Sequence, residues 1–468
     1  MLRMNQKQFK FAVAVIGILY FALLCVFAHG KTLWFDDVCQ INMVYKCSLQ
    51  DAISNIREYD NNPPASHLLS FLWIELAPYG TAWLKLPSIV FVTIAIVLIA
   101  FTADNIYGEV FGILSMVAGC SLGIIVERAA YTFRPYGLFF FASALVLYLY
   151  EKKNKPFDIG YVVALIILVY SHYFGILLVI GLFCDELVKN IRKEDGFLLK
   201  RFCQYAIAGI SIFPWLIYVM NSSLSKAGGF WTSKPGIIEL CGTLPLLLDF
   251  DVVIIAIILV QVINIIARAR DDKDELYLVA IPTGIMIVVF MFSRITELSL
   301  FVTRYFICLV PIMLILFAGG CKTIYEFGVK HNAFMKLDFG KILLMAFIIY
   351  SFLNITVYLQ GHWNNAVNPY EKVADSLNVS SDLREGNVAV LDVNTFVPRG
   401  WEYFLTQKGK LSMPRVVESV NDVDLEINKI YVVNAQFPDK DINDFVTLGE
   451  EWQLEQKSDE LPISVYVR

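Results

Sequence analysis

Charged side chains are scarce in this chain of 468 residues, of which Asp, Glu, Lys and Arg make up only 17%. Soluble proteins carry about 25% charged residues. Hydrophobic residues make up 57% of the chain, and the mean hydropathy is +0.59. The shortage of charge therefore excludes an ordinary soluble protein and indicates a polytopic membrane protein. The formal net charge of -5 says little about partners, because the distribution of the charges matters more than their sum.

The chain also lacks the usual signatures of a metal or redox centre. Its nine cysteines form no CxxC pair and no Cys/His spacing typical of metal binding. Most of them lie in apolar runs, where cysteine is a small buried hydrophobe. Cys39 and Cys47 share one polar loop and can pair there only if it faces an oxidising compartment. We therefore expect no cofactor, and no ligand set indicates a metal. Nothing indicates nucleic-acid binding, and there is no internal repeat or low-complexity linker.

Eleven apolar stretches are candidate transmembrane helices. They fall at residues 10–28, 84–102, 111–126, 137–150, 159–172, 174–188, 202–220, 246–267, 276–293, 305–320 and 341–360. Residues 159–188 are alternatively one long tilted helix. The first stretch is long and lacks a small-residue cleavage site, so we expect a retained helix rather than a signal peptide.

Basic residues collect in alternate loops. They precede the first stretch and follow the fourth, sixth, eighth and tenth, as Arg3, Lys7, Lys10, Lys152, Lys153, Lys155, Lys189, Arg192, Lys193, Lys200, Arg201, Arg268, Arg270, Lys273, Lys322, Lys330 and Lys336. Eleven spans place all five clusters on one side, which the positive-inside rule assigns to the cytoplasm. Merging residues 159–188 into one span breaks this alternation, so the parity favours eleven.

The last hundred residues have a different pattern. A helix-like stretch, Pro369–Leu377, is followed by strand-like runs at Asn387–Val393, Lys429–Val433 and Ile463–Val467. We therefore expect two domains. The first is a transmembrane domain, residues 1–360, with an extracytoplasmic loop at 29–82. The second is a small extracytoplasmic α/β domain at 361–468.

The polar motifs gather in the loops assigned to the extracytoplasmic side. Asp36 and Asp37 open the first loop, and adjacent carboxylates at a membrane surface are costly unless they bind or react. The motif Asn61-Asn62-Pro63-Pro64-Ala65-Ser66-His67 is a rigid turn. It leads into an amphipathic helix, Ala65–Leu76, that we expect to lie at the membrane interface.

Three further motifs fall at the same membrane level. These are Arg134-Pro135-Tyr136, Ser171-His172-Tyr173-Phe174-Gly175 and Thr303-Arg304-Tyr305. A guanidinium forms bidentate pairs with phosphate oxygens, although arginine and tyrosine at this depth also serve as plain anchors. A lone interfacial histidine is commonly a structural hydrogen-bonding group. Aromatic residues of the outer loops either stack on sugar rings or act as anchors: Trp34, Phe35, Phe230 and Trp231.

In this order the motifs resemble the integral-membrane GT-C glycosyltransferases, in particular the bacterial branch related to protein O-mannosyltransferases and aminoarabinose transferases. The resemblance covers about the first 360 residues. It rests on Asp36-Asp37, Pro63-Pro64, Leu84–Ser88, Arg134–Tyr136, His172–Gly175 and Arg304-Tyr305. It implies a GT-C fold with about eleven transmembrane helices.

The resemblance also implies an activity, an inverting glycosyltransferase that moves a hexosyl or pentosyl group. The donor is a polyprenyl-phosphate sugar, and the acceptor is a hydroxyl of a glycan, lipid or protein on the extracytoplasmic face. Such chemistry belongs to cell-envelope glycan, glycolipid or glycoprotein assembly in the cell membrane. The chain has no Rossmann-like soluble domain for a nucleotide sugar, which agrees with a lipid-linked donor.

The residue roles implied by the resemblance follow from the chemistry. Asp36 is the general base, and Asp37 orients the acceptor or tunes Asp36, since close carboxylates raise one another's pKa. Donor phosphate binding, and stabilisation of the leaving group, fall to Arg304, Arg134, Tyr305 and Tyr136. The other expected substrate-binding residues are Asn62, His67, His172 and Tyr173.

Two departures from the family pattern leave alternatives open. Asn62 stands where the family often has His or Lys before the two prolines. Tyr131-Thr132-Phe133 stands where the family commonly has Gln-Glu-Ala, so an acid is missing. A non-catalytic member is consistent with both. A transporter or flippase is the other alternative, although the charged motifs gather at one face and no repeated halves or paired broken helices are evident.

Overall fold

The structure is a computed structural model of the full chain. It describes residues 4–30, 33–60, 62–152, 157–190, 197–220, 232–269, 274–296, 298–331, 339–364, 369–379, 388–393, 397–407, 415–417, 423, 426–434, 448–449, 451–458, 461 and 463–468. Some residues named above lie outside this set: Arg3, Asn61, Lys153, Lys155, Arg192, Lys193, Phe230, Trp231, Arg270, Lys273, Lys336 and Asn387.

The chain forms two compact units, and each draws on three segments. The first unit comprises Met1–Phe27, Ile56–Ser66 and Lys85–Gly361, and the second comprises Ala28–Asn55, His67–Leu84 and His362–Arg468. The second unit therefore contains the C-terminal tail together with most of the first polar loop.

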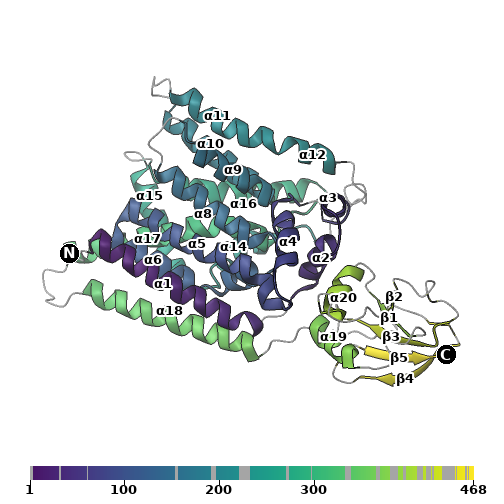
Figure 1. Cartoon of the computed structure of the whole chain (residues 1–468). Helices are drawn as coiled ribbons and strands as arrows, with labels where there is room; N and C mark the ends of the chain where they lie inside the picture. The colour runs from purple at the N-terminus through teal and green to yellow at the C-terminus, as the bar shows by residue number, and fades with distance from the viewer. Residues whose placement is uncertain are drawn as a thin grey trace. The chain divides into compact units, whose positions relative to one another are not determined.

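Helices build the first unit (Figure 1). They are α1 (Gln6–Phe27), α5 (Thr81–Tyr107), α6 (Glu109–Ser121), α7 (Gly123–Ile125), η2 (Val126–Ala130), α8 (Tyr136–Lys152), α9 (Ile159–Ser171), α10 (Phe174–Asn190), α11 (Phe197–Ser211), α12 (Phe213–Val219), α14 (Ile237–Leu246), α15 (Val252–Arg268), α16 (Tyr277–Ile295), η3 (Thr303–Leu309), α17 (Val310–His331) and α18 (Phe339–Asn364).

Helix α17 forms the centre of this unit. It packs against α6, α8, α15 and α16. Its first half, from Val310 to Ala318, is buried throughout. Gly320 permits the close approach of α15, because a Cβ atom at this position would collide with the carbonyl oxygen of Ile257.

Five helices among the described residues are long and apolar enough to cross a membrane: Gln6–Gly30, Thr81–Tyr107, Leu199–Val219, Tyr277–Ile295 and Thr303–Lys330. A sixth is added if Glu109–Ser121 and Gly123–Ala130, which meet at a 64° bend, form one span. Every predicted apolar stretch corresponds to at least one helix, although several of these helices are short. The chain is therefore a multi-pass membrane protein, and the count of eleven spans stays a prediction.

Two regions of predicted apolar sequence are divided into separate helices. Residues 159–188 form two helices, α9 and α10, which pack against each other, and not one long tilted helix. The stretch at 111–126 is broken at Leu122, and Asp249 supports the break. The backbone N–H of Ile124 donates to both carboxylate oxygens of Asp249, at 3.0 and 3.2 Å. This contact satisfies a donor that a helix N-terminus leaves open.

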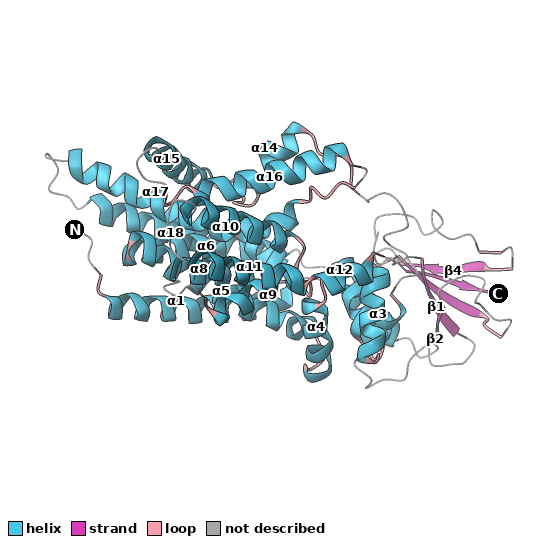
Figure 2. Cartoon of the chain, turned by 90° about the horizontal axis from the view of Figure 1, so that it is seen from above, coloured by secondary structure: helices cyan, strands magenta, loops and turns pink. Residues whose placement is uncertain are grey.

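The second unit combines short helices with a sheet, whose strands are magenta in Figure 2. Its elements are η1 (Ala28–Gly30), α2 (Phe35–Val44), most of α3 (Leu49–Tyr59) and α4 (Ala65–Leu76), α19 (Pro369–Val379), α20 (Pro398–Leu405), β1 (Val388–Asp392), β2 (Arg415–Val417), β3 (Lys429–Val433), β4 (Gln453–Lys457) and β5 (Ile463–Val467).

The sheet has the strand order β2-β1-β3-β5-β4. Strand β1 pairs in parallel with β2 and β3, whereas β5 pairs antiparallel with β3 and β4. Its apolar core includes Leu391, Ile430, Val432 and Trp452. The predicted α/β domain, with its helix near Pro369 and its three strands, is confirmed. The strands β2 and β4 and the helix α20 were not predicted.

Candidate functional site

The predicted site residues divide between the two units. Asp36, Asp37 and His67 belong to the second, whereas the first contains Asn62, Arg134, Tyr136, His172, Tyr173, Arg304 and Tyr305. The residues of the first unit form a cluster around the turn between α9 and α10. That the carboxylates of Asp36 and Asp37 join this cluster stays a prediction.

An ion pair anchors one side of the cluster. Arg134 Nη1 lies 2.7 Å from Asp60 Oδ2, and the two side chains are only 10% and 8% exposed. Asn62 Nδ2 donates to the other oxygen of the same carboxylate, Oδ1. Because an unpaired charge is costly in so dry a place, each of these groups fixes the other. Asn62 therefore acts on Arg134 through Asp60.

Asp60 was not among the predicted site residues. It immediately precedes the Asn-Asn-Pro-Pro motif, and Glu58 and Asp51 are acids of the same loop, so nothing in the sequence distinguishes it. The nearest signal is its position beside a rigid turn. Asp60 places a carboxylate next to Arg134.

His172 forms the centre of an aromatic cluster. It lies between α9 and α10, is 4% exposed, and its Nδ1 accepts a hydrogen bond from the backbone N–H of Phe174 at 3.2 Å. Its ring stacks on Phe139 with centroids 4.9 Å apart. It lies 5.0 Å from the ring of Tyr305 and 6.0 Å from that of Tyr136. These contacts make His172 a packed spacer between the two tyrosines.

Arg304 lies against the same tyrosines. Its guanidinium carbon is 5.8 Å from the ring centroids of both Tyr136 and Tyr305. Each cation–π contact contributes about 0.5–1 kcal/mol, or more where water is excluded. The charges of Arg304, Arg134 and Asp60 all act on His172. Two guanidinium groups against one carboxylate make the cluster a basic environment that suits an anion.

The segment that carries Arg134 is tightly held. It follows η2, a π-helical turn of a kind that is frequent at functional sites. The Ser88 hydroxyl donates to the carbonyl oxygen of Thr132, and the Tyr131 hydroxyl donates to that of Leu24, both at 2.8 Å. These bonds tie the segment to α5 and α1, so Arg134 extends from a rigid turn.

Lys85 is a second residue that the site prediction omitted. Its side chain is fully buried, and its ammonium lies 5.8 Å from the ring of Tyr131. Lysine is seldom fully buried, so Lys85 is a functional candidate. The sequence contained a signal, since Lys85 lies within the Leu84–Ser88 motif of the family resemblance.

Tyr173 faces a different neighbour. Its hydroxyl accepts a hydrogen bond from Trp215 Nε1 of α12 at 3.2 Å. This contact fixes the turn between α9 and α10 to α12. The residue therefore supports the turn that carries His172.

In the second unit, Asp36 and Asp37 have different environments. Asp37 is 1% exposed, and its Oδ2 accepts the backbone N–H of Trp34 at 2.8 Å. It thereby closes the first turn of α2, as an acid three residues after the cap does. Asp36 is half-buried in the same turn, where helix N–H groups stabilise a carboxylate. The geometry gives Asp37 a structural contact, and the catalytic roles expected for the two carboxylates stay predictions.

Helix α4 supports α2 from one side. Gln40 Nε2 donates to the Ser70 hydroxyl, which joins the two helices. His67 lies three residues before Ser70, on the same face of α4, and is fully buried. That His67 binds substrate stays a prediction.

Helix α20 supports α2 from the C-terminal tail. The backbone N–H of Arg399 donates to Asn42 Oδ1 at 2.8 Å, and Lys46 Nζ pairs with Glu402 Oε1 at 2.8 Å. The helices approach closely at Gly400, where a Cβ atom would lie 2.6 Å from Val38 Cγ1. The tail therefore holds the helix that carries Asp36.

No group of three or more His, Cys, Asp or Glu side chains that could hold a metal ion occurs in the described part of the chain.

No family model matches the chain, and no curated protein matches it. Among solved structures, that of ArnT from Cupriavidus metallidurans bound to undecaprenyl phosphate aligns with 97% of this chain and 97% of its own, with a TM-score of 0.62 and 12% identity. The Archaeoglobus fulgidus oligosaccharyltransferase tethered with an acceptor peptide aligns over 89% of this chain and 68% of its own, with a TM-score of 0.47 and 9% identity. The first likeness confirms the predicted GT-C fold.

Proposed function

We propose that this chain is an inverting glycosyltransferase that uses a polyprenyl-phosphate sugar and acts on the extracytoplasmic side of the membrane. The observation that carries the proposal is the buried Arg134–Asp60 pair, with Arg304 lying against Tyr136 and Tyr305 in the same cluster. The fold shared with ArnT, whose structure contains undecaprenyl phosphate, supports a lipid-linked donor.

The two arginines bind the donor phosphate. A guanidinium offers several N–H donors in a fixed plane, which match the oxygens of a phosphate. Tyr136 and Tyr305 restrict the side chain of Arg304, so less conformational freedom is lost when the phosphate binds. Preorganised positive charge at the leaving group is the principal means of stabilising this transition state.

Asp60 acts as a positioning residue for Arg134. Its ion pair holds one side of the guanidinium in place, and Asn62 holds Asp60. The chain departs from the family pattern at Asn62 and at Thr132, and the Asn62–Asp60–Arg134 contacts supply a carboxylate in a new position. Because Asp60 supplies this carboxylate, the two departures from the family pattern are compatible with catalysis.

Asp36 removes the proton from the acceptor hydroxyl. The hydroxyl oxygen attacks the anomeric carbon, the bond from that carbon to the phosphate oxygen breaks, and polyprenyl phosphate leaves as an anion. Attack opposite the leaving group inverts the sugar configuration. A positioned general base contributes about 10²- to 10⁴-fold in rate.

Transfer from radiolabelled polyprenyl-phosphate sugars into an envelope fraction tests the proposal. We expect Asp36→Asn to reduce incorporation at least 100-fold. The matched control is Asp51→Asn, which changes an exposed acid of the same loop and should keep full incorporation. Equal incorporation by wild type and Asp36→Asn removes Asp36 as the base. No incorporation by wild type with competent donors supports the non-catalytic or transport alternatives.

A further inference from the structure

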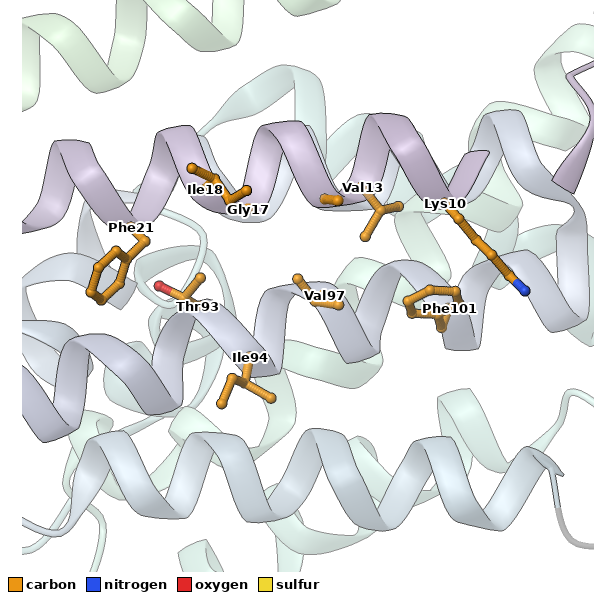
Figure 3. Close-up of a pocket in the computed structure, with 10 residues that line it drawn as sticks. Lys10, Val13, Gly17, Ile18, Phe21, Thr93, Ile94, Val97 and Phe101 are labelled. Atoms are coloured by element: carbon orange, nitrogen blue, oxygen red, sulfur yellow. The ribbon is translucent and has the colours of Figure 1, made fainter. Parts of the chain in front are cut away.

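An apolar groove is lined by residues of α1 and α5 and includes no residue of the Arg134 cluster. It has a volume of about 420 Å³ and is lined by Lys10, Val13, Ala14, Gly17, Ile18, Phe21, Thr93, Ile94, Val97 and Phe101. Figure 3 shows Lys10 at one end and Phe21 at the other. Ile18 and Ile94 at its rim are 67% and 41% exposed, so the groove is open to the surroundings of the helices.

The floor of the groove exists because α1 carries a glycine there. At Gly17 a Cβ atom would lie 3.3 Å from Val97 Cγ2. The one hydroxyl along the walls is satisfied, since Thr93 donates to the carbonyl oxygen of Ile89 at 2.8 Å. Phe101 is fixed by an edge-on contact with Phe9, with ring centroids 5.3 Å apart. Between its ends the groove therefore presents hydrocarbon alone.

The length of the groove matches one leaflet of a bilayer. From Lys10 to Phe21 the helix rises by roughly 16 Å at 1.5 Å per residue. The hydrocarbon core of a membrane is about 30 Å thick, so one leaflet is about 15 Å. A single acyl chain whose headgroup lies beside Lys10 fits this length.

The charges at the Lys10 end identify the headgroup. Lys10 lies one helical turn after Gln6 in α1, so the two side chains share this end of the helix. Gln6 Nε2 donates to Asp104 Oδ2 at 3.1 Å and to Glu109 Oε1 at 3.4 Å, so both acids are at this end. A purely anionic headgroup would meet two carboxylates. A headgroup with both a phosphate and an ammonium complements Lys10 and the acids together.

We propose that this groove binds one acyl chain of a zwitterionic glycerophospholipid, with its phosphate at Lys10 and its primary ammonium at Asp104 and Glu109. The expected topology assigns the Lys10 end to the cytoplasmic leaflet. The occupant is then a structural lipid of that leaflet and not the sugar donor, whose chemistry is assigned to the opposite face. This inference is independent of the proposed glycosyltransferase activity.

Native mass spectrometry of the full chain, delipidated in mild detergent and titrated with phosphatidylethanolamine, tests the site. Ala14→Phe fills the groove and Lys10→Gln removes the phosphate contact. We expect each to weaken binding at least tenfold. The matched controls are Val15→Phe, on a face of α1 that does not line the groove, and Lys7→Gln, a neighbouring exposed lysine. Both should bind like wild type.

Ala14→Phe adds a large side chain and could disturb folding. Lys10→Gln changes only an exposed side chain, so it tests the site without that risk. Absence of bound lipid in the wild type overturns the proposal, as does equal weakening by the control variants. Tighter binding of phosphatidylglycerol or of undecaprenyl phosphate than of phosphatidylethanolamine overturns the headgroup assignment.

Discussion

Arg134 and Asp60 are almost fully buried. Removing one of the two charges should therefore change the free energy of unfolding more than removing both. A buried charge left without its partner typically costs about 3–5 kcal/mol, whereas replacing a whole buried pair is often close to neutral. The Asn62 contact adds to this dependence, since it also ends on Asp60. The three side chains are therefore expected to behave as one unit.

We predict that Asp60→Asn and Arg134→Gln each lower the stability by about 3–5 kcal/mol. The double variant should cost much less than the sum of the two, because residues in one network are not additive. Thermal unfolding of the purified protein measures all three. The control is Glu402→Gln, which breaks the partly exposed Lys46–Glu402 pair and should cost about 1 kcal/mol or less. Additive losses would contradict the pairing.

At this scale the sequence predicted much of the cluster. Arg134, Tyr136, His172 and the Arg304-Tyr305 pair were all selected, because their motifs fall at one membrane level in the order of the family resemblance. Asp60 was missed because an acid in a polar loop looks ordinary until the fold places an arginine beside it. Asp37 was selected for chemistry, although the spacing from Trp34 to Asp37 already fits a helix cap.

At the scale of elements, the placement of α2 depends on how closely α20 approaches it. Gly400 faces Val38, and the side chains around them form polar and aromatic contacts between the two helices. A larger residue at Gly400 has no room unless one helix moves. The orientation of Asp36 is therefore sensitive to a residue of the tail that takes no part in the chemistry.

We predict that Gly400→Ala lowers stability by about 1–3 kcal/mol through overpacking and also reduces transfer. Val38→Ala removes the opposing methyl groups and should restore much of both in the double variant. Gly328→Ala is the control, since a Cβ atom there meets nothing within 4 Å. It should be neutral or slightly stabilising because alanine favours the helix. Failure of Val38→Ala to rescue would show that the loss has another origin.

Long apolar runs were sufficient to find most helices of the first unit, although α14 was not predicted, and β-branched runs found β1, β3 and β5. Strand β4 was missed because Gln453–Lys457 is a fully exposed edge strand of mostly polar residues. The bend at Leu122 was missed because the break depends on Asp249, a residue distant in the sequence. The bend at Leu122 and the role of Asp60 could not be predicted because both depend on contacts between segments distant in the sequence.

At the scale of the molecule, the two units are interleaved along the chain. The second unit takes its segments from 28–55, 67–84 and 362–468, so no single cut separates it from the first. A chain ending at Gly361 keeps α2 and α4 but loses α20 and the sheet. The tail is in this sense part of the fold of the first loop.

We predict that truncation after Gly361 abolishes transfer and lowers the unfolding temperature. In the truncated chain, the loop at residues 29–60 should become sensitive to limited proteolysis, because α2 loses its contacts with α20. The control is the full-length chain with an engineered protease site at residues 441–447, distant from α20 in sequence. This chain is cut at that site before the measurement. That cut should leave α20 in place and preserve the loop's resistance. A truncated chain with a protected loop and normal transfer would falsify the supporting role of the tail.

The contacts between α2 and α20 join residues 356 and 357 positions apart in sequence. At a synthesis rate of about 5–20 residues per second, α20 leaves the ribosome roughly 20–70 s after α2. Throughout that interval the carboxylate-bearing helix has no partner from the tail. Full seating of the proposed base therefore waits for the synthesis of α20, so a chain whose first helices are already inserted into the membrane is not yet competent for chemistry.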